Sequence, residues 1–214
     1  MGMGDEILVV ERDILFKDFY FSGFVTKEQM NYIPIILGKN EFQVRTPELE
    51  ANPAYQQIIS YIWIINPKTK QVFAYKRAGK KEHYNEGRLM NKVSCGVGGH
   101  IDKEDAGWEV IEKVMMRELK EEVKMNHYPN PKVVGFINDD SNSVGEVHFG
   151  VVAIVETTEP VEKGDNEMVS GNFYSTGHLY TIGELERMFN DTNNEVEGWT
   201  RISWPFIKDY LSKL

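Results

Sequence analysis

Residues 98–125 read GGHIDKEDAGWEVIEKVMMRELKEEVKM, and this stretch decides which fold the chain is expected to have. It opens with two glycines and carries the string Arg-Glu-Leu-Lys-Glu-Glu at 117–122. Between Ala106 and Met125 the length, the residue types and the absence of proline favour a helix, which Asn126 can end in a left-handed conformation. The stretch therefore predicts a glycine-rich loop followed by a helix.

Three carboxylates share one face of this predicted helix. At 100° per residue, Glu118, Glu121 and Glu122 fall within about 100° of one another. The same face is apolar in the preceding turns, at Ile111, Val114 and Met115. Clustered like charges raise one another's pKa and cost desolvation energy unless a cation neutralises them. Because all-oxygen ligands select hard cations over Zn²⁺, the pattern predicts a site for Mg²⁺, Mn²⁺ or Ca²⁺.

A solvated surface is the alternative interpretation of the same helix. Glutamate-rich helices are common on protein surfaces, and a second apolar stripe, formed by Met116, Leu119 and Val123, would turn the glutamates outward. The upstream Gly98-Gly99 loop favours the metal site, because the string at 117–122 is rare by chance at ordinary residue usage and the loop precedes it here.

At this point the sequence resembles the Nudix (MutT-like) hydrolase family. The signature of that family is a Gly, five residues, a Glu, seven residues, and then Arg-Glu-apolar-any-Glu-Glu-any-Gly-apolar. Gly98 and Glu104 match its first part, residues 117–122 match its central string, and Met125 matches its closing apolar position. The resemblance covers 28 residues, from 98 to 125.

The match departs from the signature in two places. Twelve residues separate Glu104 from Arg117, whereas Glu109 has the seven-residue spacing, which indicates an insertion of about five residues between loop and helix. Lys124 stands where the family has its closing glycine. The insertion leaves open which of the two glutamates supports Arg117.

The resemblance implies an α+β fold, an αβα sandwich with a mixed sheet, over residues 56–214. It further implies hydrolysis, dependent on Mg²⁺ or Mn²⁺, of a diphosphate linkage in a nucleoside diphosphate derivative or a related small molecule. Such metals bridge phosphate oxygens, neutralise charge and lower the pKa of an attacking water. Residues 1–55 form an N-terminal extension, expected to shape the substrate pocket or a homodimer interface.

The resemblance also implies roles for single residues. Four metal ligands are implied: the carboxylates of Glu118, Glu121 and Glu122 and the backbone carbonyl of Gly98. Glu121 is counted among the catalytic residues as well. Arg117 is implied to be structural, paired with Glu104 or Glu109, and not a phosphate clamp.

Two further groups of candidates lie outside the signature. Family members often add a carboxylate from a later strand or loop, and Glu167 is the first choice for this base, with Glu146 the second. Arg77 and Lys80 follow a predicted hairpin and are candidates for the distal phosphate or leaving group, and Tyr84 is a candidate for stacking on a base or sugar. Ordinary surface or core roles are the alternative for each of them.

The rest of the chain supplies the elements of such a fold. Strands are expected at 58–65 and 71–77, joined as a hairpin, and again at 93–101, 132–137 and 146–155. A capping box at Thr181 and Glu184 predicts a helix through Asn190, and a last helix is expected from Ser203 to Lys213. In the extension we expect a strand near 7–16 and a helix from Thr26 that Pro34 bends or ends.

Composition limits the partners. The 214 residues include 24 Lys and Arg against 33 Asp and Glu, a net charge of −9, so no nucleic-acid polymer is expected as a partner. The longest nearly apolar run, Ile58–Ile65, is far shorter than the roughly 20 residues that cross a bilayer, so no membrane partner is expected. The acidic N-terminus does not resemble a signal peptide and Cys95 is the single cysteine, which predicts a cytoplasmic location.

Two other functions stay open at the level of sequence. The first is a binding module of the same fold that senses a nucleotide or metal without turnover. The second is an enzyme similar to isopentenyl diphosphate isomerases, which requires a reactive Cys95; a small buried hydrophobe is the favoured interpretation of that residue. His100 and His148 are interpreted as structural hydrogen-bonding residues, because neither has a ligand partner at metal-site spacing.

Overall fold

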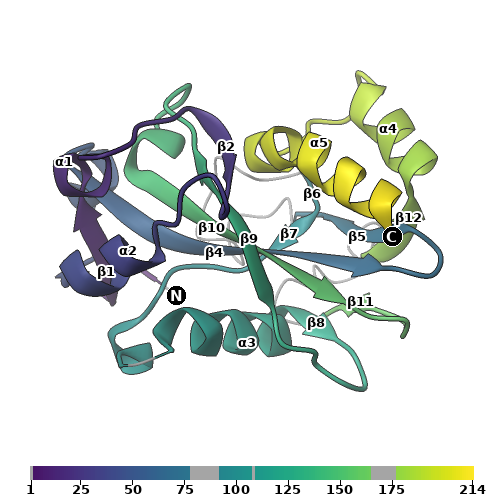
Figure 1. Cartoon of the computed structure of the whole chain (residues 1–214), viewed down its shortest axis with the longest axis horizontal. Helices are drawn as coiled ribbons and strands as arrows, with labels where there is room; N and C mark the ends of the chain where they lie inside the picture. The colour runs from purple at the N-terminus through teal and green to yellow at the C-terminus, as the bar shows by residue number, and fades with distance from the viewer. Residues whose placement is uncertain (1, 78–91, 108, 165–176) are drawn as a thin grey trace. The chain divides into compact units, whose positions relative to one another are not determined.

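The computed structural model describes residues 2–77, 92–107, 109–164 and 177–214, and its helices and strands belong to two compact units (Figure 1). The first unit comprises Met1–Tyr61, Gly98–Met115 and Lys132–Ala153, and the second comprises Ile62–Val97, Met116–Pro131 and Ile154–Leu214. The predicted division at residues 55 and 56 stays a prediction.

The first unit is built on antiparallel pairs of strands. Its elements are β1 (Glu6–Glu11), α1 (Arg12–Leu15), β2 (Gly23–Thr26), α2 (Ile33–Lys39), β3 (Asn40–Val44), η1 (Leu49–Ala51), the start of β4 (Tyr55–Asn66), η4 (Lys103–Asp105), β9 (Lys132–Asn138), η5 (Gly145–Val147) and most of β10 (His148–Glu156). β1 pairs with both β3 and β4, and β2 pairs with β9. The strands follow the order β4-β10-β9-β2.

Aromatic rings from the N-terminal segment complete the core of this unit. The Tyr32 ring lies 5.1 Å from that of Phe149 and 5.2 Å from that of Phe136, in edge-to-face contacts, and Phe16 and Phe21 add further contacts with Phe149. Such edge-to-face pairs stabilise a core beyond the area that they bury. The first 55 residues therefore contribute core side chains as well as strands.

The expected helix from Thr26 was wrong. Thr26 ends the strand β2, and the helix α2 begins only at Ile33, with Pro34 in its first turn. Proline is favoured at this position because the first helical N–H groups have no partner within the helix and the fixed φ of proline is already helical. Pro34 therefore begins a helix where the sequence suggested that it would end one.

The second unit contains the predicted hairpin. Its elements are the end of β4, β5 (Gln71–Lys76), β6 (Val93–Ser94), β7 (Gly96–Val97), most of α3 (Val110–Glu122), β8 (Val123–Lys124), β11 (Glu162–Lys163), β12 (His178–Thr181), α4 (Ile182–Asn190) and α5 (Gly198–Lys213). β4 and β5 pair antiparallel with Ile65 opposite Val72, and β12 adds to β5. The strands follow the order β12-β5-β4. The helix α4 has the predicted capping box at Thr181 and Glu184.

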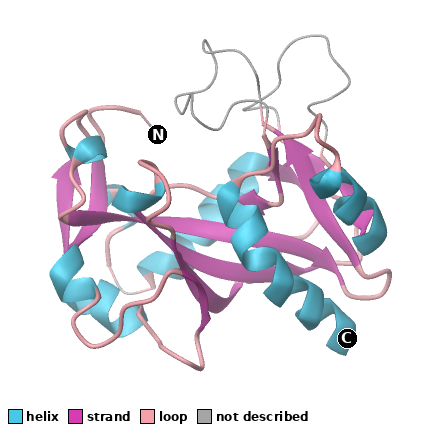
Figure 2. Ribbon diagram, turned by 90° about the horizontal axis from the view of Figure 1, so that it is seen from above, coloured by secondary structure: helices cyan, strands magenta, loops and turns pink. Residues whose placement is uncertain are grey.

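The last helix begins five residues before the predicted start at Ser203. It runs from Gly198 to the residue before the C-terminus, which is marked in Figure 2, and contains Pro205 in its interior. Ser203 does not cap this helix: its hydroxyl donates to the carbonyl of Trp199 at 2.6 Å and accepts from the Trp63 indole of β4 at 3.1 Å. Ser203 therefore lies inside the helix and bonds to β4, and it does not mark the helix start.

The structure confirms the predicted fold class, α+β with a mixed sheet. In the part of the chain that the structure describes, no helix combines the length and the apolar character needed to cross a bilayer.

Candidate active site at the end of helix α3

The helix that carries the three glutamates is shorter than the sequence predicted. It runs from Val110 to Glu122, against an expected 106–125. Gly107 and Glu109 have φ angles of 131° and 66°, which a right-handed helix does not contain, so the helix begins after them. Between the glycine-rich loop and the helix, Lys103–Asp105 form the 3-10 helix η4, closed by a reciprocal capping box of Asp102 and Asp105.

The three carboxylates differ in their exposure. Glu118 is 6 % exposed and lies in the buried stripe of the helix, next to Leu119. Glu122 is half-buried, and the Glu121 side chain is 48 % exposed. The helix therefore turns one carboxylate inward, holds one at the boundary and presents one to solvent.

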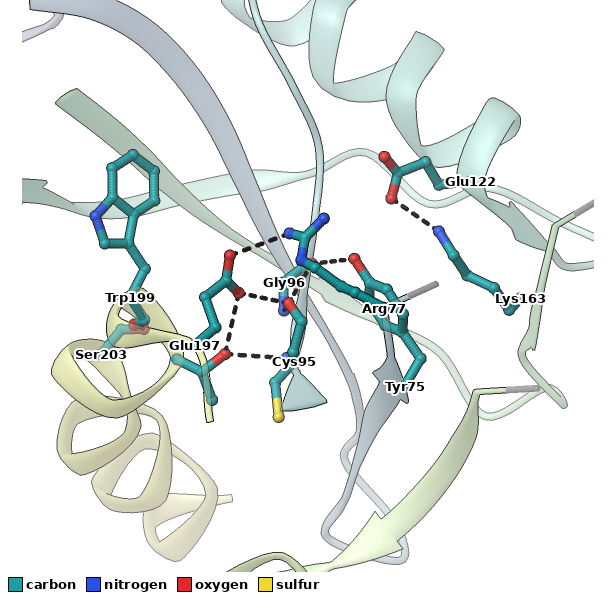
Figure 3. A network of polar contacts seen from close by, with 11 residues as sticks. Tyr75, Arg77, Cys95, Gly96, Glu122, Lys163, Glu197, Trp199 and Ser203 are labelled. Carbon is teal, nitrogen blue, oxygen red and sulfur yellow. Dashed lines mark hydrogen bonds and ion pairs between the residues drawn. The ribbon is translucent and has the colours of Figure 1, made fainter. Parts of the chain in front are cut away.

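Two cations lie against these carboxylates. The Nη1 atom of Arg117 is 2.7 Å from Oε1 of Glu118 and 3.3 Å from Oε2 of Glu121. The Nζ atom of Lys163 is 3.1 Å from Oε2 of Glu122, and Figure 3 shows its side chain pointing at that carboxylate. Arg117 is thus engaged by glutamates of its own helix, while its predicted support by Glu104 or Glu109 stays a prediction.

Lys163 is held in place by backbone pairing. β11 pairs with β8 directly after α3, with Lys163 opposite Val123, so that the two short strands lie side by side (Figure 1). The N–H of Gly164 donates to the carbonyl of Glu122 at 2.7 Å, and a Cβ at Gly164 would approach the Glu121 carbonyl to 2.8 Å. Only glycine permits this approach without a shift of backbone, and it fixes the lysine at the end of the helix.

The Lys163 ammonium is nearly removed from water. Its side chain is 3 % exposed, and its Nζ lies 4.4 Å from the centroid of the Tyr75 ring. The Tyr75 hydroxyl in turn donates to the carbonyl of Gly96 at 3.0 Å, which fixes the ring (Figure 3). A buried ammonium needs both a counter-charge and further contacts, and here a carboxylate and an aromatic face provide them.

Replacing Lys163 with methionine is therefore expected to destabilise the protein by about 2 kcal/mol, because the half-buried Glu122 loses its counter-charge. The further change Glu122→Gln should recover about half of this loss, which a double-mutant cycle in urea denaturation measures. The control is Lys208→Met, which breaks an exposed ion pair with Glu186 and should cost less than about 0.5 kcal/mol. Equal losses in the two lysine variants would contradict the structural role of Lys163.

The environment of Glu118 raises the pKa of its carboxyl group to about 7. Burial is the largest cause, and the neighbouring charges of Glu122 and Glu121 add to it, while Arg117 opposes the rise. Desolvation disfavours the ionised carboxylate and so do negative neighbours. In the metal-free protein Glu118 thus holds its proton at a pH where an ordinary glutamate has lost it.

This shift predicts that the metal-free protein loses stability as the pH rises from about 4.5 to about 7. The folded state binds the Glu118 proton more tightly than the unfolded chain does, so its contribution is complete below the ordinary pKa and is lost as the pH passes the raised pKa. The loss should be about 3 kcal/mol in urea denaturation with a chelator present. Glu118→Gln, which cannot titrate, should lack this loss; an equal loss in both proteins would refute the assignment.

The donor set at the end of α3 fits a hard divalent cation. Three carboxylates within five residues provide only oxygen ligands, and the buried one lacks sufficient positive charge to ionise fully at neutral pH. Their oxygens are not drawn together, since they are not among the described groups of three ligand atoms within 4.8 Å of one another. Repulsion between like charges favours this separation, and Lys163 attracts Glu122 alone.

Arg77, a predicted substrate-binding residue, is engaged in a buried ion pair. Its Nη2 atom lies 3.1 Å from Oε1 of Glu197, the residue before α5, and both side chains are at most 10 % exposed. The other Glu197 oxygen accepts from the Ser94 hydroxyl at 2.5 Å, and the group forms the network drawn in Figure 3. The structure thus shows Arg77 linking β5 to the start of α5, and its contact with substrate stays a prediction.

The remaining predicted site residues fall into two groups. Lys80, Tyr84 and Glu167 lie outside the described residues. Four others belong to the first unit: Gly98 in a loop with φ of 140°, Glu104 exposed on η4, Glu109 exposed before α3, and Glu146 exposed on η5. The predicted roles of all seven stay predictions.

Cys95 is completely buried, as the sequence indicated. Burial, with the Glu197 carboxylate nearby, raises the pKa of its thiol well above the ordinary value. Because the thiolate is the nucleophilic form of cysteine, this environment makes the residue inert. The isomerase hypothesis therefore finds no support in the structure.

Two features of the structure were not predicted. Lys163 was not singled out, because nothing in Glu162-Lys163-Gly164 distinguishes it from a surface lysine until β8 and β11 pair. Glu50, His100 and His148, which are far apart in the sequence, bring possible ligand atoms together in the first unit. No spacing rule connects three residues that lie about 50 positions apart.

Comparison with known proteins identifies the fold. No family model matches the chain. The crystal structure of Tm1382, provisionally described as a Nudix hydrolase, matches 98 % of this chain and 100 % of its own chain with a TM-score of 0.72 and 24 % identity. The chain therefore has the Nudix fold, which confirms the resemblance inferred from residues 98–125.

Sequence comparison adds a curated relative. The chain is 31 % identical over 224 residues to protein YmaB of Bacillus subtilis (strain 168), with 99 % of this chain and 100 % of that protein covered. The chain therefore belongs to the same family as YmaB. The NUDIX domain of Shewanella oneidensis NrtR, complexed with ADP ribose, matches 74 % of this chain and 88 % of its own at a TM-score of 0.46 and 12 % identity, too distant to bear on what this chain binds.

Proposed function

We propose that this chain is a Mg²⁺- or Mn²⁺-dependent hydrolase that cleaves a diphosphate linkage in a nucleoside diphosphate derivative or a related small molecule. Glu118, Glu121 and Glu122 would hold the metal. The metal would supply a Lewis acid for the phosphate oxygens and lower the pKa of the attacking water. The observation that carries the proposal is the carboxylate of Glu118, buried in the apolar stripe of α3 with two more carboxylates beside it.

A buried carboxylate with acidic neighbours is costly in a protein that has no use for it. Desolvation and repulsion both disfavour the ionised Glu118, and a divalent cation relieves both. A purely structural role would be served better by a further apolar residue at this position of the stripe. The arrangement therefore favours a site built to receive a cation.

Lys163 and Arg117 have distinct parts in this proposal. Arg117 orients Glu118 and Glu121, because its Nη1 atom contacts both carboxylates. Lys163 balances the charge of Glu122 from a position that is nearly removed from water, so its part is to position that carboxylate and not to contact substrate.

For the general base we keep Glu167 as the first choice and Glu146 as the second. Glu167 follows Gly164 by three residues, and Gly164 is hydrogen-bonded to the carbonyl of Glu122 at the end of α3. This closeness along the chain supports the choice of Glu167. Glu167→Gln should then lower kcat more than Glu146→Gln.

A binding module that senses a nucleotide is the second candidate. The observation in its favour is the Lys163 ammonium on Glu122, because this pair neutralises one carboxylate without any metal. The two functions are separated by incubating the protein with ADP-ribose, NADH, dinucleoside polyphosphates and nucleoside triphosphates, with Mg²⁺ or Mn²⁺, and measuring phosphate released after phosphatase coupling. The hydrolase turns over at least one of them, whereas binding without turnover of any would establish the sensor.

A further inference from the structure

Three side chains with metal-binding groups meet inside the first unit, and only His100 among them belongs to the stretch 98–125. Glu50 is on η1, His100 follows the Gly98-Gly99 loop, and His148 is the first residue of β10. One ligand atom of each lies within 4.8 Å of the others, and no other such trio of His, Cys, Asp or Glu occurs among the described residues. His100 and His148 are 9 % and 5 % exposed.

The orientation of His148 leaves a lone pair facing the cluster. Its Nδ1 atom lies 2.6 Å from the carbonyl oxygen of Val144. Because a carbonyl only accepts, Nδ1 carries the proton, and the neutral ring then has its lone pair on Nε2. This Nε2 lies 3.3 Å from Nε2 of His100. A histidine that donates Nδ1–H to a backbone carbonyl and turns Nε2 to a cation is the usual arrangement of a metal ligand.

The second histidine has an imperfect hydrogen-bond partner. Nε2 of His100 lies 2.8 Å from Oε1 of Gln57, whose side chain is completely buried. Because an amide oxygen only accepts, this Nε2 carries the proton before a metal binds, and a cation at Nε2 would move that proton to Nδ1. The amide nitrogen of Gln57 has no hydrogen-bond partner among the described residues. A buried donor without a partner is rare and costly, which indicates that a polar group belongs beside this pair.

The third group is held by a buried arginine. The Nε atom of Arg45 lies 2.7 Å from Oε1 of Glu50, and both side chains are at most 10 % exposed. This contact fixes the carboxylate near the two imidazoles and compensates its charge.

We propose that Glu50, His100 and His148 form a Zn²⁺ site, separate from the carboxylates of α3. A tetrahedral Zn²⁺ with Zn–N bonds of about 2.0–2.1 Å places two nitrogen ligands roughly 3.4 Å apart, close to the observed 3.3 Å. Bringing the carboxylate oxygen to the same spacing requires it to move by about 1.4 Å at most. Two imidazoles and one carboxylate select Zn²⁺ over Mg²⁺, whereas the three carboxylates of α3 have the opposite preference.

The site has a structural role, because its three ligands are too deeply buried to admit a substrate. Zn²⁺ would join the segment after β3, the glycine-rich loop and the start of β10. Along the sequence these three parts are separated by about 50 residues each. Binding to the folded state alone then raises the melting temperature with metal concentration.

The test uses the full chain stripped of metal with a chelator and the ions alone as probes. We expect one equivalent of Zn²⁺ to remain after gel filtration, and the absorption bands of tetrahedral Co²⁺ to appear on titration with that ion. At a free Zn²⁺ concentration of about 100 times Kd, the melting temperature should rise by roughly 5–10 °C. Zn²⁺ should also shift the imidazole ¹⁵N resonances of two histidines in the unaltered protein, a measurement that needs no variant.

Two variants locate the metal, and two more serve as controls. Glu50→Gln and His148→Gln should weaken Zn²⁺ binding by at least about a hundredfold, since each removes a direct ligand. His127→Gln is the matched control, because the His127 side chain is 84 % exposed and bonded to Glu159 on the surface. Glu121→Gln should retain Zn²⁺, which separates this site from the proposed hydrolase site. Zn²⁺ bound equally by all variants, or no histidine shift in the unaltered protein, would show that the two imidazoles share only an N–H···N hydrogen bond.

Discussion

Glu121→Gln is expected to lower kcat by about a thousandfold or more on whichever diphosphate the protein hydrolyses, and to leave the fold intact. A metal-bound oxygen stabilises transition-state charge by several kcal/mol, and each 1.4 kcal/mol is a factor of ten in rate. The Glu121 side chain is 48 % exposed, so its ion pair with Arg117 contributes little to stability. The measurement is steady-state kinetics at saturating Mg²⁺, together with urea denaturation.

The matched control for this experiment is Glu112→Gln. Glu112 is exposed on the first turn of the same helix and lies outside the acidic cluster at its end. It should keep the kcat of the unaltered protein within about twofold, since no metal ligand or substrate contact is removed. Unaltered kcat in the Glu121 variant would refute the metal assignment and leave the function of the acidic cluster open.

Gly98→Ala is expected to destabilise the protein by about 4 kcal/mol. Gly98 has a φ of 140°, a conformation in which L side chains are strained, and a Cβ there would lie 2.1 Å from the carbonyl oxygen of Ser60. Ser60 lies on β4, and its N–H donates to the carbonyl of Gly99 at 2.9 Å, so the loop and the strand cannot separate without losing this bond. Urea denaturation monitored by circular dichroism measures the loss.

Gly183→Ala serves as the control for the chemical change from glycine to alanine. Gly183 lies in the first turn of α4 without a positive φ, and a Cβ added there would have open space around it to 4 Å. Alanine is the better helix former, so this variant should be stabilised by up to about 1 kcal/mol. A Gly98→Ala protein as stable as the unaltered one would mean that the loop does not approach β4 as closely as the structure shows.

Local signals predicted the elements that depend on neighbouring residues. The hairpin of β4 and β5 was predicted because a polar turn with Pro67 separates two runs rich in β-branched and aromatic residues. The helix α4 was predicted because Thr181 and Glu184 satisfy backbone donors within one turn. The predictions at Pro34 and Ser203 were wrong. A proline can begin a helix as well as end one, and a serine can cap a helix or lie within it, so neither residue type fixes a helix boundary by itself.

The sequence alone determined the glycine-rich loop and the helix that ends in three carboxylates, and through them the Nudix fold. These features could be predicted because they lie within 28 consecutive residues and follow helical geometry. Tertiary structure alone decided that Glu118 is buried and Glu121 exposed, that Lys163 faces Glu122, and that Glu50 meets two histidines. These depend on chain segments that become neighbours only when strands pair, and helical periodicity carries no information about such distant partners.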